Sequence, residues 1–522
     1  MVDSLESLSG RAFDVAVIGA GINGAAAAQE LAAAGYKVLL VDKQDYAAGA
    51  SSRSSRILHC GLRYLAPGTS AWEFVRNPGK FGVAMRMARN ALIERDEFVQ
   101  KSPDRAKPST FFYPVYKGGT YAPWQMRIAF AILNALAPKG IPVGSRRYGR
   151  KSVADYPILG LLRDADKLAD VFSFEEYVFD WPERICVDCA MDARRMGAVV
   201  RNYTSVTGLQ FDHSAKRWTI QLSDVTEGGA TAVTAGHIIN AAGVWIDKVN
   251  AFGSNSAPRK IFGTKGANIV VRLPDGCQGY GIAGLNQIQE PIYARPWGNL
   301  HYIGPTETVF EGDPDDVYAD EDDIGFLLKE ANYLFPTLRL KREDVIYTWA
   351  GVRPLTYDPA YPKGKRSMEI HDLGNDGMPN TIAITAGPIM THRIAGQQLL
   401  AEIAKQVKPS GQPKKLDTSG RTFTARGEAP ISPLLPAVTA SQIQDIAKTE
   451  QCFSLIDIMF RRARFGWTET MGSDVAADVA SIVADELGWS AERARSEVAD
   501  YLDYLATYHR FHPAGVRESQ NA

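Results

Sequence analysis

The sequence has few cysteines and no excess of charge of either sign. Its five cysteines are an odd number scattered among 522 residues, which excludes a disulfide framework and is typical of a reducing compartment. The 58 basic and 59 acidic residues give a net charge of −1, so no overall field attracts nucleic acid. Because apolar residues make up 45% and charged residues 22% of the chain, a disordered or fibrous protein is excluded.

The sequence also lacks a long hydrophobic run. The longest apolar stretch with helical spacing, 124–137, contains Arg127 and is shorter than the roughly 20 residues that a membrane span needs. Residues 1–13 include Asp3 and Glu6 and have no long apolar core, so we expect no signal peptide. We therefore expect a cytoplasmic protein that at most binds peripherally to the inner face of a membrane.

We expect no metal site. Cys186 and Cys189 form a C-x-x-C pair, but a structural zinc site needs four ligands and no second close pair is present. The acid-rich stretch 311–323 does not have the ligand spacing of a calcium-binding loop. This stretch predicts a solvated loop, followed by acidic residues at the start of a helix that runs through Leu334.

The first forty-odd residues predict a strand, a tight turn, a helix and a second strand. Residues 14–18 are a short apolar run, 25–34 are nearly all helix-forming, and 37–41 are a second apolar run. The turn between the first strand and the helix has the spacing G-x-G-x-x-G. In this context the motif indicates a dinucleotide-binding βαβ unit over 14–42.

Each residue of this motif has a physical role. Gly19 makes the turn, Gly21 lets the backbone approach a pyrophosphate, and Gly24 lets the helix pack on the strand. The N-terminus of the helix offers free N–H groups to the phosphates. Asp42 ends the second strand, where its carboxylate can accept the hydroxyl groups of the adenosine ribose.

The rest of the chain favours FAD over NAD as the dinucleotide. The sequence contains one such fingerprint and no second one, which favours an embedded flavin that the substrate reduces directly. Residues 47–56 are small and hydroxyl side chains with two arginines, which suit a pyrophosphate and the edge of an isoalloxazine ring. Residues 240–245 supply a second glycine turn after an apolar strand.

Several segments resemble the FAD-dependent glycerol-3-phosphate dehydrogenases, in the same order and with similar spacing. The most specific is the string S-S-R-S-S-R-I-L-H-C-G-L-R-Y-L. The segments that carry the resemblance are 14–43, 51–65, 262–266, 351–355 and 460–464.

The resemblance implies an α/β fold class with an α+β substrate domain. A Rossmann-type FAD-binding domain is interleaved with an antiparallel-sheet substrate domain over 1–404. A stretch dense in Pro, Lys, Gly and Ser over 405–436 predicts a linker. Helical periodicity beyond it predicts a small helical C-terminal domain over 437–522. In that domain we expect the arginines of 461–464 to form interdomain ion pairs or a solvated face.

The same resemblance implies a cofactor site, a substrate site and a reaction. The family oxidises a secondary alcohol beside a phosphorylated carbon and passes the electrons to quinone or to oxygen. Monomer and homodimer both remain open. We expect FAD to contact Gly19, Gly21, Asn23, Gly24, Asp42, Ser51, Ser52, Ser55, Val206, Ala242, Gly243, Trp245, Gly387, Met390 and Thr391.

Five residues are candidates for the chemistry on a small anionic substrate. His59 is the candidate base, because imidazole titrates near neutral pH, although it could instead be a structural residue of its loop. By resemblance, Lys265 would hold charge near the flavin or activate oxygen. Arg63 and Arg353 are candidate anchors for the anion, and Arg353 also belongs to the catalytic set. Tyr64 is a further candidate contact.

One more candidate lies in a segment that departs from the family. His392 is a candidate substrate contact, but four residues earlier Pro388 replaces a basic phosphate ligand. Asn268 stands where the family has histidine, and Cys60 stands where it has glycine. Residues 362–366 contain Lys363, Lys365 and Arg366, any of which could supply a third charge.

These departures leave the substrate open. Either the pocket is rebuilt around a glycerol-3-phosphate-like molecule, or the substrate is a different polyol, hydroxy acid, amine or amino acid. A flavin-binding subunit without activity is the non-enzymatic alternative.

Overall fold

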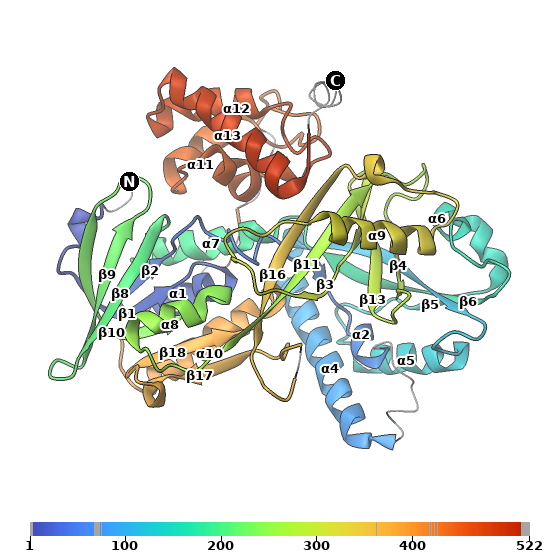
Figure 1. Ribbon diagram of the computed structural model, residues 1–522, viewed down its shortest axis with the longest axis horizontal. Coiled ribbons are helices and arrows are strands. Elements are labelled where there is room, and N and C mark those ends of the chain that lie inside the picture. The colour runs from blue at the N-terminus through green and yellow to red at the C-terminus, as the bar shows by residue number, and fades with distance from the viewer. Residues whose placement is uncertain are drawn as a thin grey trace.

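The computed structural model describes residues 4–512, except for 67–73, 75, 362, 417, 419, 422 and 425. Pro362, parts of the expected linker and the end of the expected C-terminal domain therefore lie outside the described residues. Two sheets lie side by side, and a group of C-terminal helices lies at the top of Figure 1 above their junction. This mixed architecture confirms the predicted fold class.

The first sheet is mainly parallel, as expected for strands that are joined by crossover segments. Its central strands follow the order β18-β10-β1-β2-β7 and all run in one direction. Antiparallel β17 extends one edge, and the β8–β9 hairpin pairs with the first half of β10. The strands are β1 (Ala12–Ile18), β2 (Val38–Val41), β7 (Val199–Arg201), β8 (Thr204–Asp212), β9 (Arg217–Asp224), β10 (Ala230–Asn240), β17 (Glu369–Asp372) and β18 (Thr381–Thr385).

Three helices pack against one another beside this sheet. The alanine-rich α1 is buried along nearly its whole length, between α7 and α10. Small residues allow this close approach: a Cβ atom on Gly396 would lie 2.8 Å from the carbonyl oxygen of Ala26. The three helices are α1 (Ile22–Ala33), α7 (Pro182–Arg195) and α10 (His392–Ala404).

The second sheet is antiparallel apart from the pair formed by β12 and β4. Its path is β15-β11-β14-β13-β12-β4-β6-β3, with β16 beside β11 and β5 beside β6. Its strands are β3 (Ile57–Leu58), β4 (Lys107–Tyr116), β5 (Arg146–Tyr148), β6 (Leu168–Val178), β11 (Ile261–Val271), β12 (Tyr280–Leu285), β13 (Pro291–Trp297), β14 (Leu300–Gly304), β15 (Thr308–Val309) and β16 (Tyr347–Thr356).

The two faces of the second sheet are covered differently. On one face Ile269 and Ile303 pack with Leu327 of α9 (Glu321–Leu334), the helix expected after the acidic stretch. On the other face Tyr302 and Trp349 pack with C-terminal helices. The rest of that second face is open and lines a cavity. The remaining helices are α2 (Leu62–Leu65), α4 (Pro78–Lys101), α5 (Pro123–Leu136), α6 (Pro157–Gly160), α8 (Ile246–Gly253), α11 (Ala440–Thr449), α12 (Ala476–Leu487) and α13 (Ala491–His509).

The elements fall close to the expected boundaries. No helix or strand lies between the end of α10 at Ala404 and the start of α11 at Ala440 in the described part of the chain, and only helices follow. The division into domains stays a prediction. Among the described residues, no helix has both the length and the apolar character that crossing a membrane requires.

Candidate active site

A cavity of about 490 Å³ connects the two sheets. At one end it is lined by Ile18, Val41 and Ala241, where β1, β2 and β10 finish. At the other end it is lined by Gly266 and Gly351 on the open face of the second sheet. Ligands of open α/β sheets bind outside the carboxyl ends of the strands, so the first end is the expected place for a nucleotide.

The glycine turn at this nucleotide end closes tightly upon itself. Gly19 has φ +99°, and a Cβ atom on Gly24 would lie 1.9 Å from the Gly19 carbonyl oxygen. A Cβ atom on Gly21 would instead meet only the Ser51 hydroxyl, at 3.4 Å. The fold of the turn therefore requires glycine at positions 19 and 24. Gly21 instead borders open space in the cavity.

Asp42 lies beside this turn at the end of β2. Its carboxylate accepts hydrogen bonds from the Ala20 N–H at 2.7 Å and the Gln44 N–H at 2.9 Å. Burial raises the pKa of Asp42 to about 6, against the lowering effect of these two donors. The carboxylate is thus fixed by the backbone at the wall of the cavity.

The nucleotide end also contains polar atoms that lack partners. Asn23 Oδ1 and Trp245 Nε1 are buried without a hydrogen bond, and both residues line the cavity. Buried polar atoms are nearly always paired, so these two fit a polar ligand. Together with the N-terminus of α1, which lies at the cavity, they form a site that fits a dinucleotide.

The other end of the cavity has a strongly basic wall. Arg63, Arg295, Arg353 and Arg366 all line it. Arg366 forms an ion pair with Glu307. No ion pair joins any of the other three arginines to a carboxylate of a described residue. This wall therefore fits an anion.

Arg353 is built into the wall by its strand neighbour. A Cβ atom on Gly266 would lie 2.2 Å from Arg353 Nη2, so this glycine leaves room for the guanidinium group. Nη2 donates to the Thr306 carbonyl at 3.2 Å, while Nη1 is buried without a partner. Burial, followed by repulsion from Arg366, lowers the pKa of Arg353 to about 10.

His59 lies among these arginines. Its ring centroid is 6.3 Å from that of Tyr293, which also lines the cavity. Burial holds the pKa of His59 well below its usual value, and repulsion from Arg63 and then Arg295 adds to this effect. The imidazole is therefore neutral at neutral pH and able to accept a proton.

Comparison with known proteins identifies the family. Residues 14–399 match the family described as FAD dependent oxidoreductase. This chain belongs to that family. The FAD-dependent oxidoreductase is also 27% identical to the glycerol-3-phosphate dehydrogenase of Synechocystis, over 95% of this chain and 96% of that one. It is 29% identical to the aerobic glycerol-3-phosphate dehydrogenase of Staphylococcus epidermidis, over 76% of this chain and 68% of that one.

Solved structures share the fold. The glycerol-3-phosphate dehydrogenase of Bacillus halodurans, complexed with FAD, has a TM-score of 0.70 and 19% identity, covering 97% of this chain and 96% of its own. The glycine oxidase of Geobacillus kaustophilus has a TM-score of 0.52 and 18% identity, over 78% of this chain and 99% of its own. The expectation of an FAD-dependent enzyme is thereby confirmed, and FAD is the cofactor of this oxidoreductase.

Most of the residues expected at the site of the oxidoreductase line the cavity. Those expected to contact FAD and found in the lining are Gly19, Gly21, Asn23, Asp42, Ser51, Ser55, Val206, Ala242, Gly243, Trp245, Gly387 and Met390. Those expected at the substrate and found in the lining are His59, Arg63, Tyr64 and Arg353. Their roles stay predictions.

Lys265 does not line the cavity, and the strand period explains why. Side chains alternate along β11, so Gly266 and Asn268 face the cavity while Lys265 faces α9. The Lys265 ammonium forms ion pairs with Asp320 at 2.5 Å and with Asp323 at 2.7 Å. In the structure this lysine neutralises the acidic start of α9, and its expected role near the flavin stays a prediction.

Four other expected contacts also lie behind the lining. His392 is buried, donates from Nδ1 to the Ile389 carbonyl at 2.8 Å, and makes an edge-to-face contact with Phe98. Thr391 donates to the Pro388 carbonyl at 2.9 Å. Ser52 is buried and donates to the Gly49 carbonyl at 3.2 Å. Like Gly24, these residues shape the wall from behind.

Two arginines of the basic wall were not predicted individually from the sequence. Arg366 was one of three candidates for a third charge, together with Lys363 and Lys365. All three form ion pairs, but Arg366 is the one of them that lines the cavity. Arg295 was not predicted. The one available signal is that Arg295 lies two residues after Tyr293 on the same strand, so that both side chains face the same side of the sheet.

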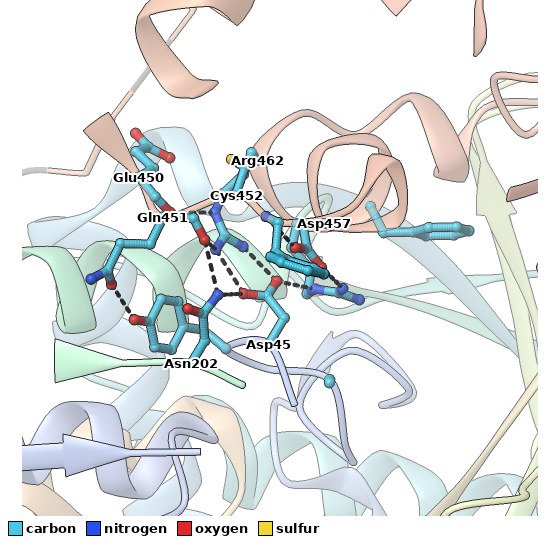
Figure 2. Close-up of polar contacts among 12 residues, drawn as sticks. Asp45, Asn202, Glu450, Gln451, Cys452, Asp457 and Arg462 are labelled. Atoms are coloured by element: carbon cyan, nitrogen blue, oxygen red, sulfur yellow. Dashed lines mark hydrogen bonds and ion pairs between the residues drawn. The ribbon is translucent and has the colours of Figure 1, made fainter. Parts of the chain in front are cut away.

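A buried charge network attaches the C-terminal segment to the nucleotide end (Figure 2). Asp45, three residues beyond Asp42, accepts from Arg461 at 2.5 Å and from Arg462 at 2.7 Å, and all three charged groups are buried. Asn202 also donates to Asp45, at 2.9 Å. Of the arginines expected in interdomain ion pairs or on a solvated face, Arg461 and Arg462 thus form buried ion pairs, whereas Arg464 forms a partly exposed one with Asp180.

Proposed function

We propose that this oxidoreductase oxidises a secondary alcohol of a small phosphorylated polyol, with glycerol 3-phosphate as the first candidate. The observation that carries the proposal is the convergence of Arg63, Arg353 and Arg366 beside His59, in a cavity whose other end fits FAD. A phosphate dianion that leaves water needs several charge-assisted donors, which guanidinium groups supply best. The names of the relatives support the same substrate class.

In this proposal each side chain has one task. Arg63, Arg353 and Arg366 bind the phosphate and so orient the carbinol carbon, with Tyr64 packed beside Arg63. His59 takes the hydroxyl proton, because its imidazole is held neutral. FAD supplies the acceptor for the hydride. The residues of the nucleotide end that line the cavity hold FAD, and quinone or oxygen takes its electrons.

Pro388 supports a second candidate, the oxidation of a hydroxy acid or amino acid. Pro388 lines the cavity where the resembled family has a basic residue, so the wall has one cation fewer than that pattern. A carboxylate carries less charge than a phosphate and needs fewer donors. The similarity of fold to the glycine oxidase is compatible with this candidate.

Anaerobic bleaching of the flavin absorbance tests the proposal. Holoenzyme is mixed with glycerol 3-phosphate, glycerol, glycerate, glycine and proline, and we expect the phosphorylated alcohol to reduce the flavin fastest. Arg353→Met should weaken reduction by glycerol 3-phosphate about 100-fold, because it removes a buried donor to the anion, and should change reduction by glycerol far less. Bleaching by amino acids alone would overturn the proposal, as would equal losses for charged and neutral alcohols.

The matched control is Arg272→Met. Arg272 directly follows the end of β11 and forms an exposed ion pair with Glu469. Since exposed pairs contribute little, this variant should reduce at the rate of the unaltered protein with every compound. A loss in the control would mean that the Arg353 result reports general damage.

A further inference from the structure

Arg295 adds to the basic wall a charge that a single phosphate does not require. Its side chain is 1% exposed and lies on β13, in the cavity lining. Arg353 and Arg366 come from β16 and the loop that follows it, and Arg63 from α2. Arg295 therefore reaches the cavity from a different part of the second sheet.

The strand register shows how far apart these positions are. Arg295 is opposite Tyr302, and Tyr302 is opposite Val270 of β11. Arg353 is opposite Thr264 of the same strand. The two side chains therefore start from different places on the sheet, yet they converge on one cavity, where the charge of Arg295 contributes to lowering the pKa of Arg353. The guanidinium of Arg353 also lies against Gly266, whereas that of Arg295 lies against the Ser55 carbonyl.

His59 lines the same cavity and is repelled by Arg295 as well as by Arg63 and Arg366. Repulsion from Arg295 affects the pKa of His59 more strongly than repulsion from Arg366 does. For the pKa of Arg353 the order is reversed, and Arg295 has the weaker effect. Arg295 therefore acts on the candidate base as well as on Arg353.

Arg295 also has donors to spare. Nη1 donates to the Ser55 carbonyl at 2.8 Å and to the Tyr302 hydroxyl at 3.4 Å. Nε is buried without a partner, and Nη2 makes no hydrogen bond with a described residue. The guanidinium lies over the rings of Tyr293 and Tyr302, at 4.3 and 5.1 Å. No ion pair with a described carboxylate neutralises this buried charge.

We propose that Arg295 binds a second anionic group of the substrate, so that the preferred substrate is a phosphorylated hydroxy acid. Its phosphate occupies the wall formed by Arg63, Arg353 and Arg366, its carboxylate contacts Arg295, and its carbinol lies between them at His59. This inference rests on the proposed function, since it assumes oxidation of an alcohol with the phosphate at those three arginines.

The reaction balances without a further reactant. The C–H bond of the carbinol carbon breaks and its hydride, with both electrons, passes to FAD. The O–H bond breaks and its proton passes to His59, so the carbinol becomes a ketone. Two adjacent cationic sites also oppose binding of an alcohol that carries no charge, because it would leave buried guanidinium groups unpaired.

The test compares 3-phosphoglycerate, which carries both groups, with glycerol 3-phosphate and glycerate, which carry one each. Anaerobic flavin reduction by holoenzyme should be about 100-fold more efficient, in the ratio of rate to apparent dissociation constant, with 3-phosphoglycerate than with either. Arg295→Met should lose this preference, so that 3-phosphoglycerate and glycerol 3-phosphate reduce the flavin with similar efficiency. Arg295→Lys keeps the charge and should recover part of the preference.

Two further measurements distinguish failure of the Arg295 inference from failure of the proposed function. The reduction potential of bound FAD and the FAD content are measured in each Arg295 variant, with Arg272→Met as the control. If Arg295→Met shifts the potential and slows every compound equally, Arg295 acts on the flavin and the inference is overturned. If glycerol 3-phosphate is preferred in the unaltered protein, the inference is overturned while the proposed function stands. If neither phosphorylated compound reduces the flavin but amino acids do, the proposed function itself fails.

Discussion

The two ends of the cavity are built in different ways. At the nucleotide end, backbone N–H groups, glycines and one fixed carboxylate form the wall, and most of them lie within thirty residues of one another in the chain. At the substrate end, long charged side chains form the wall, and they come from α2, β13, β16 and a loop. The first end is determined by local backbone geometry, and the second by the register of a sheet.

This difference has a consequence for function. A wall made of backbone changes little when side chains are replaced, so the same cofactor can be bound by chains with little sequence in common. A wall made of side chains can change its preference with one substitution on one strand. The oxidoreductase shows both: its glycine turn fits the dinucleotide-binding pattern, while Pro388 and Asn268 depart at the substrate end from the family that the sequence resembles.

The largest expected effect concerns the support behind the nucleotide end. Asp45→Asn leaves Arg461 and Arg462 buried beside a neutral amide, and breaking such a buried pair costs about 3–5 kcal/mol. We expect a corresponding fall in the free energy of unfolding by urea, together with weaker FAD binding. Substrate preference in FAD-loaded protein should not change, because the network does not reach the basic wall.

The stability that the Asp45 ion pairs contribute should depend on pH. Attraction by Arg462 and Arg461 outweighs burial and holds the pKa of Asp45 well below its usual range. The stabilisation is therefore complete above about pH 4, the ordinary value of an aspartate, and is lost as the pH falls through the acid range. The control is Asp445→Asn, which breaks an exposed pair with Arg426 and should cost less than about 1 kcal/mol. Equal losses in both variants would refute a special role for Asp45.

The glycine turn offers a sharper contrast within the nucleotide end. Gly24→Ala places a methyl group against the Gly19 carbonyl and should destabilise the apoprotein by about 3 kcal/mol. Gly21→Ala meets only the Ser51 hydroxyl, so the apoprotein should unfold at nearly the same urea concentration. It should nevertheless bind FAD more weakly, because the methyl group enters the cavity.

Urea unfolding of the apoprotein and titration with FAD check both glycine variants. Gly21 and Gly24 are in one motif, yet they should separate stability from cofactor affinity. Loss of apoprotein stability in Gly21→Ala would mean that the protein, and not the ligand, requires this glycine. Unchanged FAD affinity in the same variant would place the pyrophosphate elsewhere.

The same contrast explains what could be predicted from the sequence. The βαβ unit, Asp42 and the FAD site follow from contiguous patterns, in which local geometry determines the contacts. Arg63 and Arg353 were found because they lie in short recognisable strings. Arg295 could not be found, because its place in the wall depends on pairing with β14 and β11. The orientation of Lys265 could not be predicted either, because strand alternation places it on the opposite face of β11 from its neighbour Gly266.

The smallest expected effect concerns protonation at the substrate end. Because the pKa of His59 lies well below its usual value, the rate of flavin reduction at saturating substrate should stay constant as the pH falls from 8 through 6.5. Arg63→Gln removes the strongest repulsion on His59 after burial itself, so the acidic decline should move toward neutral pH. His59→Ala should slow reduction strongly at every pH without releasing FAD. Rapid-mixing measurements of the flavin reduction rate across this pH range test the prediction. A rate that already declines near pH 6.5 in the unaltered protein would contradict a base held neutral by the basic wall. So would an acidic decline that occurs at the same pH in Arg63→Gln.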